Sequence, residues 1–159
     1  MAFEKCVEYF EKLGLADRIK VFDGSSATVA EAAQVNGTTE GEICKTLSFK
    51  TPEGECILIE CRGDAKIDNR KFKDQFHFKA KMLTAEEVVD FTGHAIGGVC
   101  AFAIEREDVT AYTDISLKEY EYVYPAVGSA NSAIKLTPDE LHEYSHAKEW
   151  IDVCKLPEE

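Results

Sequence analysis

Hydrophobic residues recur along the chain with two different spacings, and each spacing predicts a different kind of element. Near the N-terminus, Phe3, Val7, Phe10 and Leu13 lie three or four positions apart and the pattern stops at Gly14, which predicts an amphipathic helix. Extended segments are predicted where apolar residues alternate or run together, over residues 18–22, 43–50, 55–61, 78–82, 109–113, 121–127 and 132–136. The turn sequence TPEG at 51–54 joins two of these segments and predicts a β-hairpin.

Three more helices are predicted from their first turns, where a threonine is followed three positions later by a glutamate. This spacing matches the capping box, in which the two residues satisfy unpaired backbone amides, and it occurs at Thr28 and Glu31, Thr84 and Glu87, and Thr137 and Glu140. Pro138 suits the first position of the last helix because that position needs no amide hydrogen. Helices and strands interleave without a regular βαβα order, and no linker or repeat divides the chain. We therefore expect one α+β domain with a mixed or largely antiparallel sheet.

Composition and charge limit the possible partners and cellular location of this domain. The 159 residues are 45% hydrophobic, enough for one ordinary core. The net charge of -12 argues against a general coat for nucleic acid or anionic membrane, while leaving room for a local basic patch. No apolar run approaches the roughly 18–20 residues of a spanning helix, and charges interrupt the N-terminal segment. We expect a cytoplasmic protein with no membrane and no DNA partner. The six cysteines include no C-x-x-C pair, which predicts buried free thiols.

Lys45 is the most informative single position, within the segment ICKTLSFK. Alternation along a strand places it on one face with Ile43, Leu47 and Phe49, so an ammonium group occupies an apolar face. A desolvated lysine needs polar partners, and such a residue often marks a site for an anion or a polar substrate. The alternative is a lysine near a strand end whose side chain extends to solvent.

Glycines form a second feature, in the segments TGHAIGGVCAF and VGSANSAIKL. The first contains Gly93, Gly97 and Gly98, and the second begins near Gly128. Glycine-rich loops let backbone amides approach a ligand closely and stabilise an oxyanion. The same glycines also suit ordinary turns between strands, and the pattern does not decide between the two interpretations.

A strip of positive charge forms the third feature. Residues 62–81 carry a net charge of +4 within an acidic chain, from three aspartates and from Arg62, Lys66, Arg70, Lys71, Lys73, Lys79 and Lys81. Because Phe72, Phe76 and Phe78 are interspersed, the strip could meet a phosphate backbone. The alternative is a solvated helix face whose aromatic side chains point into the core.

The sequence HEYSH at 142–146 matches the helical zinc signature H-E-x-x-H, in which two histidines one turn apart bind the metal. In the extended signature a glycine stands where this chain has Glu149, and a histidine where it has Asp152. Because of these departures we expect no metal site and no cofactor, and a zinc hydrolase built on His142 and His146 is the lesser alternative.

Four segments in one order resemble a known family: E-x-x-ICKTLSFK, GDAKIDNRKFK, TGHAIGGVCAFA and VGSANSAIKLTPDEL. Together they are similar to the YbaK/ProRS-associated domain family, trans-acting aminoacyl-tRNA deacylases related to the editing domain of prolyl-tRNA synthetase. The resemblance covers about residues 20–154, which suggests an N-terminal helix and lead-in at 1–19 and one globular unit at 20–159. It implies an α+β fold with a mixed, partly barrel-like sheet flanked by helices, and a cleft for the aminoacylated end of a tRNA.

The resemblance also implies roles for individual residues. Lys45, from the K-T-L strand, is implied as the catalytic residue, and Asp64 and Lys66 match the family's G-D-x-x motif. The residues implied to bind substrate are Gly97, Gly98, Val99, Gly128, Ser129, Ala130 and Asn131. With the basic strip in mind, we expect Lys66, Arg70, Lys71 and Lys73 to face the tRNA. Ala101 stands where the family commonly has proline, a change that would loosen the loop and alter which amino acid is accepted.

The resemblance implies hydrolysis of the ester of a mischarged tRNA, specifically a proline tRNA carrying a wrong small amino acid such as cysteine or alanine. Water or the substrate's own thiol would attack, and nothing in the sequence chooses between them. Because a chain of -12 should bind tRNA weakly, an aminoacyl-tRNA synthetase is a further expected partner. The alternative is a non-catalytic module of the same fold that binds aminoacyl-tRNA, a nucleotide or a protein.

Overall fold

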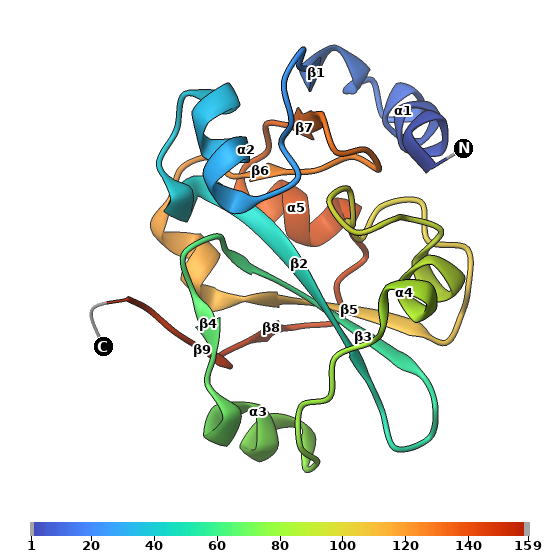
Figure 1. Cartoon of the computed structure of the whole chain (residues 1–159), viewed down its shortest axis with the longest axis vertical. Coiled ribbons are helices and arrows are strands. Elements are labelled where there is room, and N and C mark those ends of the chain that lie inside the picture. The colour runs from blue at the N-terminus through green and yellow to red at the C-terminus, as the bar shows by residue number, and fades with distance from the viewer. Residues whose placement is uncertain (1, 158–159) are drawn as a thin grey trace.

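A mixed five-stranded sheet forms the centre of the molecule, and helices pack on both of its faces (Figure 1). The computed structural model describes residues 2–157. The helices are α1 (Ala2–Lys12), α2 (Val29–Asn36), α3 (Asn69–Phe76), α4 (Ala85–Thr92) and α5 (Pro138–Tyr144). The strands are β1 (Ile19–Val21), β2 (Ile43–Lys50), β3 (Cys56–Arg62), β4 (Lys66–Ile67), β5 (Val109–Asp114), β6 (Tyr124–Pro125), β7 (Ser132–Ile134), β8 (Trp150–Ile151) and β9 (Cys154–Lys155).

The predicted helix starts are confirmed. Thr28, Thr84 and Thr137 cap α2, α4 and α5, and in each case the glutamate three positions later completes a capping box. The helix predicted at the N-terminus is also present as α1. Helix α3 was not predicted as an element; its start is capped by Asp68, whose carboxylate accepts from the Arg70 and Lys71 amides. An aspartate at this position is as good a helix cap as threonine, so a signal was present in the sequence.

The sheet has strand order β6-β2-β3-β5-β8, with β2 and β3 antiparallel and the other neighbours parallel. The predicted hairpin is therefore confirmed as β2–β3, and the fold class as α+β with a mixed sheet. Two short ladders, β1–β7 and β4–β9, form separate two-stranded sheets. A single bridge between Val123 and Leu136 links the β1–β7 ladder to the strand region around β6.

The segment predicted as a strand at 78–82 is wrong as a separate strand. Only Met82 forms a bridge, to Phe49, and the Lys50 amide donates to the Lys81 carbonyl. The Phe78 side chain packs into the core below α3, so its apolar character reflects packing of a connecting loop and not a β-ladder. The short strands β4, β8 and β9 were missed because two residues carry no readable alternation.

The two faces of the sheet have different cores. Alternate residues of β3 point to opposite sides: Ile57 and Ile59 join the cluster around α3, whereas Leu58 joins the cluster around α4. A larger cluster packs α1 and α5 together through Phe10 and Leu141. The N-terminal helix is thereby part of the main core.

All six cysteines are buried and free, as predicted. Among residues 2–157, no helix is long and apolar enough to cross a membrane.

Candidate functional site

A cavity of about 260 Å³ lies along the free edge of β2. Strand β6 pairs with β2 only at Ile43 and Cys44, and the next contact on that edge is the bridge from Phe49 to Met82. Between these points β2 has no strand neighbour on this side, and residues Lys45, Thr46, Leu47 and Ser48 line the cavity. An open strand edge leaves unpaired backbone groups that can bind a ligand, so this edge is a natural place for a site.

Backbone groups of β2 face the cavity at Thr46. The Ser48 carbonyl accepts from the Leu83 amide and the Lys50 amide donates to the Lys81 carbonyl, so the even-numbered residues direct their backbone groups to the free edge. By the alternation of an antiparallel pair, the amide and carbonyl of Thr46 also face this edge. The hydroxyls of Thr46 and Ser26 line the same cavity, are buried, and have no hydrogen-bond partner within residues 2–157. The wall of the cavity therefore offers several polar groups to a ligand.

The Lys45 side chain is half-buried and lines the cavity. Its Nζ donates to the carbonyl of Ala65, in the loop just after β3. An ammonium group carries three N–H donors, so two remain for another partner. Lys45 can therefore share its face with core residues because a backbone carbonyl accepts a hydrogen bond from its charged end.

The GDAK segment explains how that carbonyl is positioned. Asp64 accepts two hydrogen bonds from Arg62, at 2.9 and 2.7 Å, and Arg62 also pairs with Glu119 at 2.9 Å. Arg62 lies over the ring of Tyr120. This network fixes the turn that precedes Ala65, so Asp64 has a structural role, while Lys66 is exposed beside it.

Three loops from distant parts of the chain meet at the cavity, those around residues 22–28, 96–99 and 126–133. The Gly128 amide donates to the Gly98 carbonyl at 3.1 Å, and the Ser26 amide donates to the Ala130 carbonyl at 2.7 Å. A Cβ atom on Gly98 would lie 2.6 Å from the Ser129 nitrogen. Only glycine permits this close approach, so both glycine segments are needed to bring the loops together.

The predicted substrate-binding residues divide into two groups. Gly97 and Val99 line the cavity, and within residues 2–157 neither of their amides donates a hydrogen bond. The others lie behind this lining as support: Gly98, Gly128, Ser129, Ala130 and Asn131. The Gly98 amide donates to Ala95 in a turn and the Gly128 amide donates to Gly98, so of these four amides those of Gly97 and Val99 are free to bind a carbonyl oxygen.

Sequence reasoning missed several lining residues. Ser26, Ala27 and Thr28 belong to the lead-in to α2, and Met82 and Ile96 stand at the mouth with exposed fractions of 58% and 66%. The run of small residues before the Thr28 capping box is compatible with a loop that approaches a ligand, but that signal is weak. Ile96 directly precedes the paired glycines, but its exposure is visible only in the structure, so no signal in the sequence pointed to it.

Two buried ionisable groups, Glu60 and Cys44, lie on the face of the β2–β3 hairpin that carries the Thr46 side chain. Glu60 pairs with Thr46 across the hairpin and accepts from the Ser145 hydroxyl at 2.8 Å. Burial raises the pKa of Glu60 to about 8. Burial also raises the pKa of the Cys44 thiol well above its usual range, so this cavity-lining cysteine is a poor nucleophile.

The basic strip is only partly a free surface. Arg62 is buried in its ion pairs, and Lys71 is half-buried and pairs with Asp152 at 3.1 Å. Lys66, Arg70 and Lys73 are exposed. Phe72 is buried and Phe76 packs beside it, so the aromatic rings point inward and a helix face with internal aromatics describes this region.

The two histidines of the H-E-x-x-H sequence do not lie one turn apart on a helix. Helix α5 ends at Tyr144, and His146 lies beyond it with a positive φ of 52°. His142 bonds to the Thr113 hydroxyl at 2.6 Å and stacks on Trp150, whereas His146 bonds to the Tyr9 hydroxyl at 3.3 Å. The imidazoles thus have separate partners, which argues against the zinc hydrolase.

Comparison with known proteins agrees with this geometry. A family model described as an aminoacyl-tRNA editing domain matches residues 23–144. The uncharacterised protein YwhH of Bacillus subtilis (strain 168) is 47% identical over 155 residues, covering 98% of each chain. A proline–tRNA ligase of Trichlorobacter lovleyi is 27% identical over 89 residues, which are 55% of this chain and 16% of the ligase. A crystal structure of a candidate trans-editing enzyme for prolyl-tRNA synthetase superposes with a TM-score of 0.85 and 28% identity, covering 97% of both chains.

Proposed function

Because the chain belongs to the aminoacyl-tRNA editing domain family, we propose that it is a trans-acting deacylase that hydrolyses the ester of a mischarged tRNA. The tRNA is a proline tRNA, and the amino acid removed is small, such as cysteine or alanine. The enzyme works in the cytoplasm, where charged tRNA is used, and an aminoacyl-tRNA synthetase is the partner that raises its local concentration near the substrate.

One observation carries this proposal: Lys45 lines the same cavity as Gly97 and Val99, whose amides are unpaired within residues 2–157. Its volume of about 260 Å³ is below the roughly 300–1,000 Å³ typical of pockets for drug-sized ligands. A single small aminoacyl group with its ribose is a ligand of suitable size, and the exposed Met82 and Ile96 at the mouth can pack against the terminal base.

Each lining group has a task in ester hydrolysis. Lys45 uses its two remaining N–H donors to hold the terminal ribose or phosphate, so the ester is placed at the glycine loop. The Gly97 and Val99 amides donate to the carbonyl oxygen and stabilise the negative charge that develops on it during attack. Attack by water gives the free amino acid and the tRNA 3′ hydroxyl, which takes up the proton that the water loses.

The exposed cations Lys66, Arg70 and Lys73 are the surface on which the tRNA backbone docks. They follow the loop whose Ala65 carbonyl accepts from Lys45, and the 3′ end of a tRNA docked on them would reach past this loop to the cavity. Lys71 contributes less to docking because it already pairs with Asp152.

The test is the rate of ester hydrolysis on proline tRNA charged separately with cysteine, alanine and proline. We expect rapid release of one wrong amino acid, and a loss of at least about 100-fold in Lys45→Ala, the effect of removing one preorganised donor. Lys50→Ala is the matched control, since Lys50 lies on the same strand but pairs with Glu87 outside the cavity. It should retain the wild-type rate.

Two results would contradict the proposal. If none of the three charged tRNAs is hydrolysed, the chain is not a deacylase for proline tRNA. If hydrolysis is equal in wild type and Lys45→Ala, Lys45 is not the catalytic residue. Tight binding of aminoacyl-tRNA without hydrolysis would instead establish the non-catalytic module.

A further inference from the structure

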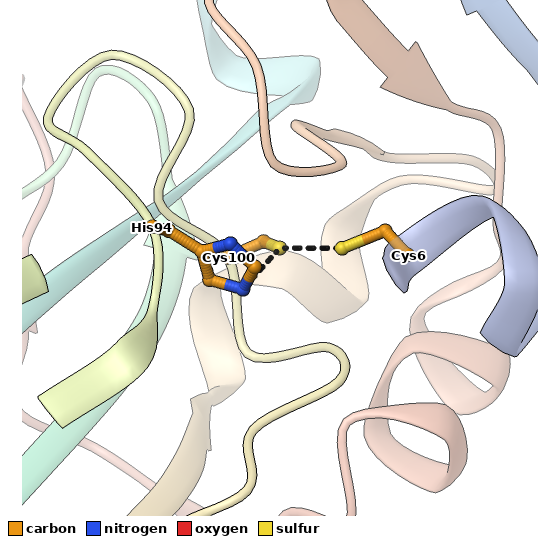
Figure 2. Close-up of side chains that lie close together, drawn as sticks. All are labelled: Cys6, His94 and Cys100. Carbon is orange, nitrogen blue, oxygen red and sulfur yellow. Dashed lines mark hydrogen bonds between the residues drawn. The ribbon is translucent and has the colours of Figure 1, made fainter. Parts of the chain in front are cut away.

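Three potential metal ligands meet in the core beside the cavity loop (Figure 2). Cys6 comes from the middle of α1, His94 follows the glycine that ends α4, and Cys100 follows the loop that carries Gly97 and Val99. Cys6 and Cys100 have no exposed surface, and His94 is 1% exposed. This is the one group of three or more such ligands found within residues 2–157.

The spacing of the ligand atoms fits a tetrahedral ion. The sulfurs of Cys6 and Cys100 lie 3.8 Å apart, and the Cys100 sulfur lies 3.5 Å from His94 Nε2. With Zn–S of about 2.3 Å and Zn–N of about 2.0–2.1 Å, a tetrahedron has an S–S edge of about 3.8 Å and an S–N edge of about 3.6 Å. All three ligand atoms lie within 4.8 Å of one another, so small side-chain movements would complete the third edge.

A fourth donor is already in place. The carbonyl oxygen of Phe102 lies 2.9 Å from His94 Nε2 and 4.0 Å from the Cys6 sulfur. The other ring nitrogen, Nδ1, is buried and has no hydrogen-bond partner within residues 2–157. Because the metal would bind Nε2, this nitrogen would remain without a partner, and the case for a metal rests on the spacing of the ligand atoms.

The charge of the ligand set also suits its surroundings. A divalent ion with two thiolates has no net charge, which makes this set acceptable in an apolar core.

We propose that Cys6, His94 and Cys100 form a structural zinc site, with the Phe102 carbonyl as the fourth donor. Binding releases one proton from each thiol, and the imidazole proton moves from Nε2 to Nδ1 as Nε2 takes the metal. Two thiolates and one imidazole favour zinc over magnesium or calcium. This proposal departs from the expectation of a chain without metal, and it does not depend on the deacylase activity.

Such a site would hold two segments of the chain together. The ion would join α1 to the segment 94–100, which contains the cavity-lining residues Gly97 and Val99. Because all three ligands are buried, zinc would enter as the chain folds and would then exchange slowly. The N-terminal helix would thereby stabilise the loop whose amides face the cavity.

The experiment is to refold the full chain from denaturant with a phosphine reductant, either with zinc or with a chelator. Bound metal is then counted by mass spectrometry after gel filtration. We expect one zinc ion per chain, two protons released per ion in weakly buffered solution, and a higher melting temperature for the zinc-loaded protein. Cobalt(II) in place of zinc should give the absorption bands of a tetrahedral thiolate site.

Variants identify the ligands. Cys6→Ser and Cys100→Ser change one atom each and should weaken zinc binding at least about 100-fold, since even indirect partners of a metal site cost 10–100-fold. Cys56→Ser is the matched control, because Cys56 is equally buried but lies in the α4 cluster. Circular dichroism of each variant without zinc shows whether it folds.

Several outcomes would overturn the proposal. These are wild-type protein that takes up no zinc on refolding, or uptake that is equal in wild type, Cys6→Ser and Cys100→Ser. A Cys6–Cys100 disulfide that forms under air, together with no zinc uptake after its reduction, would assign the pair to redox chemistry instead. If the serine variants do not fold, the wild-type metal count and proton release still decide the question.

Discussion

The two sides of the β2–β3 hairpin differ in what covers them. On one side, α3 places Phe72 against Phe49, with ring centres 5.0 Å apart, and the space is filled. Along the free edge of β2, three loops surround the strand together with residues of α2 and α4, and a cavity remains. A helix satisfies its own backbone and can present large apolar side chains, whereas loops bring unpaired amides and hydroxyls. The filled side stabilises the hairpin, and the open edge can bind a ligand.

The loops at the open edge are held by backbone contacts between segments far apart in sequence. The Phe22 amide donates to the Asn131 carbonyl at 2.7 Å, and the Gly128 amide donates to the Gly98 carbonyl at 3.1 Å. The α3 side depends instead on side-chain packing. Substitutions should therefore affect stability on the α3 side and the shape of the cavity on the loop side.

The largest effect is expected from Phe72→Ala. Removing a fully buried phenylalanine should lower the free energy of unfolding by about 3–5 kcal/mol, because the side chain's contacts are lost and a void remains. Urea denaturation measures this loss. The deacylation rate of the folded variant should equal that of the wild type, since Phe72 does not line the cavity. If the deacylation rate dropped strongly under conditions where the variant is fully folded, packing on the α3 side would influence the cavity.

The second-largest effect is expected from Glu60→Gln, which removes an ionisable side chain that is fully buried on strand β3. The pKa of Glu60 is raised from 4.5 to about 8, so the folded state holds a proton that the unfolded state releases. The stability of the wild type should therefore fall as the pH rises from 5 to 8, by on the order of 3 kcal/mol. Glu60→Gln carries no such proton, and its unfolding free energy should change much less over this range. If the unfolding free energies of both proteins changed with pH in the same way, the pKa of Glu60 would not be the cause of the pH dependence. Glu53→Gln, at the exposed hairpin turn, is the control.

A smaller effect is expected from Gly98→Ala on the loop side. The added Cβ would meet the Ser129 backbone, which cannot move aside as a flexible side chain could, at a cost of about 1–3 kcal/mol. Because the two loops must separate, the deacylation rate should fall by at least about tenfold, more than the stability loss alone explains. Gly24→Ala is the control, since its Cβ would make only an ordinary contact with Val35 at 3.7 Å. If both variants behave alike, the close approach of the loops is not required.

The smallest effect is expected from Arg70→Glu combined with Lys73→Glu, on the outer surface of α3. Loss of two phosphate contacts should raise KM for tRNA, leave kcat unchanged and reduce the salt slope of binding by about two. Lys12→Glu, in α1 at the other end of the molecule (Figure 1), is the control and should change neither. An unchanged KM and salt slope in the double variant would place the tRNA elsewhere.

The candidate site could be predicted only in part. Lys45, Gly97 and Val99 line the cavity, as expected for a substrate pocket, but their roles stay a prediction until the Lys45→Ala experiment. The alternation rule placed Thr46 and Ser48 on the face opposite to Lys45, yet all three line one cavity. The rule describes the two faces of a strand, and this cavity lies along its edge, where side chains from both faces meet backbone groups.

The sequence by itself determined the elements whose causes are local. Capping boxes place the starts of α2, α4 and α5, and the turn at 51–54 joins β2 to β3, because these signals act over four residues or fewer. Only the tertiary structure decided that the edge of β2 stays open, that the Ala65 carbonyl holds Lys45, and that Cys6 lies beside Cys100. These contacts join residues 20 to 94 positions apart. No short-range pattern encodes such contacts, since they depend on how all the elements pack together.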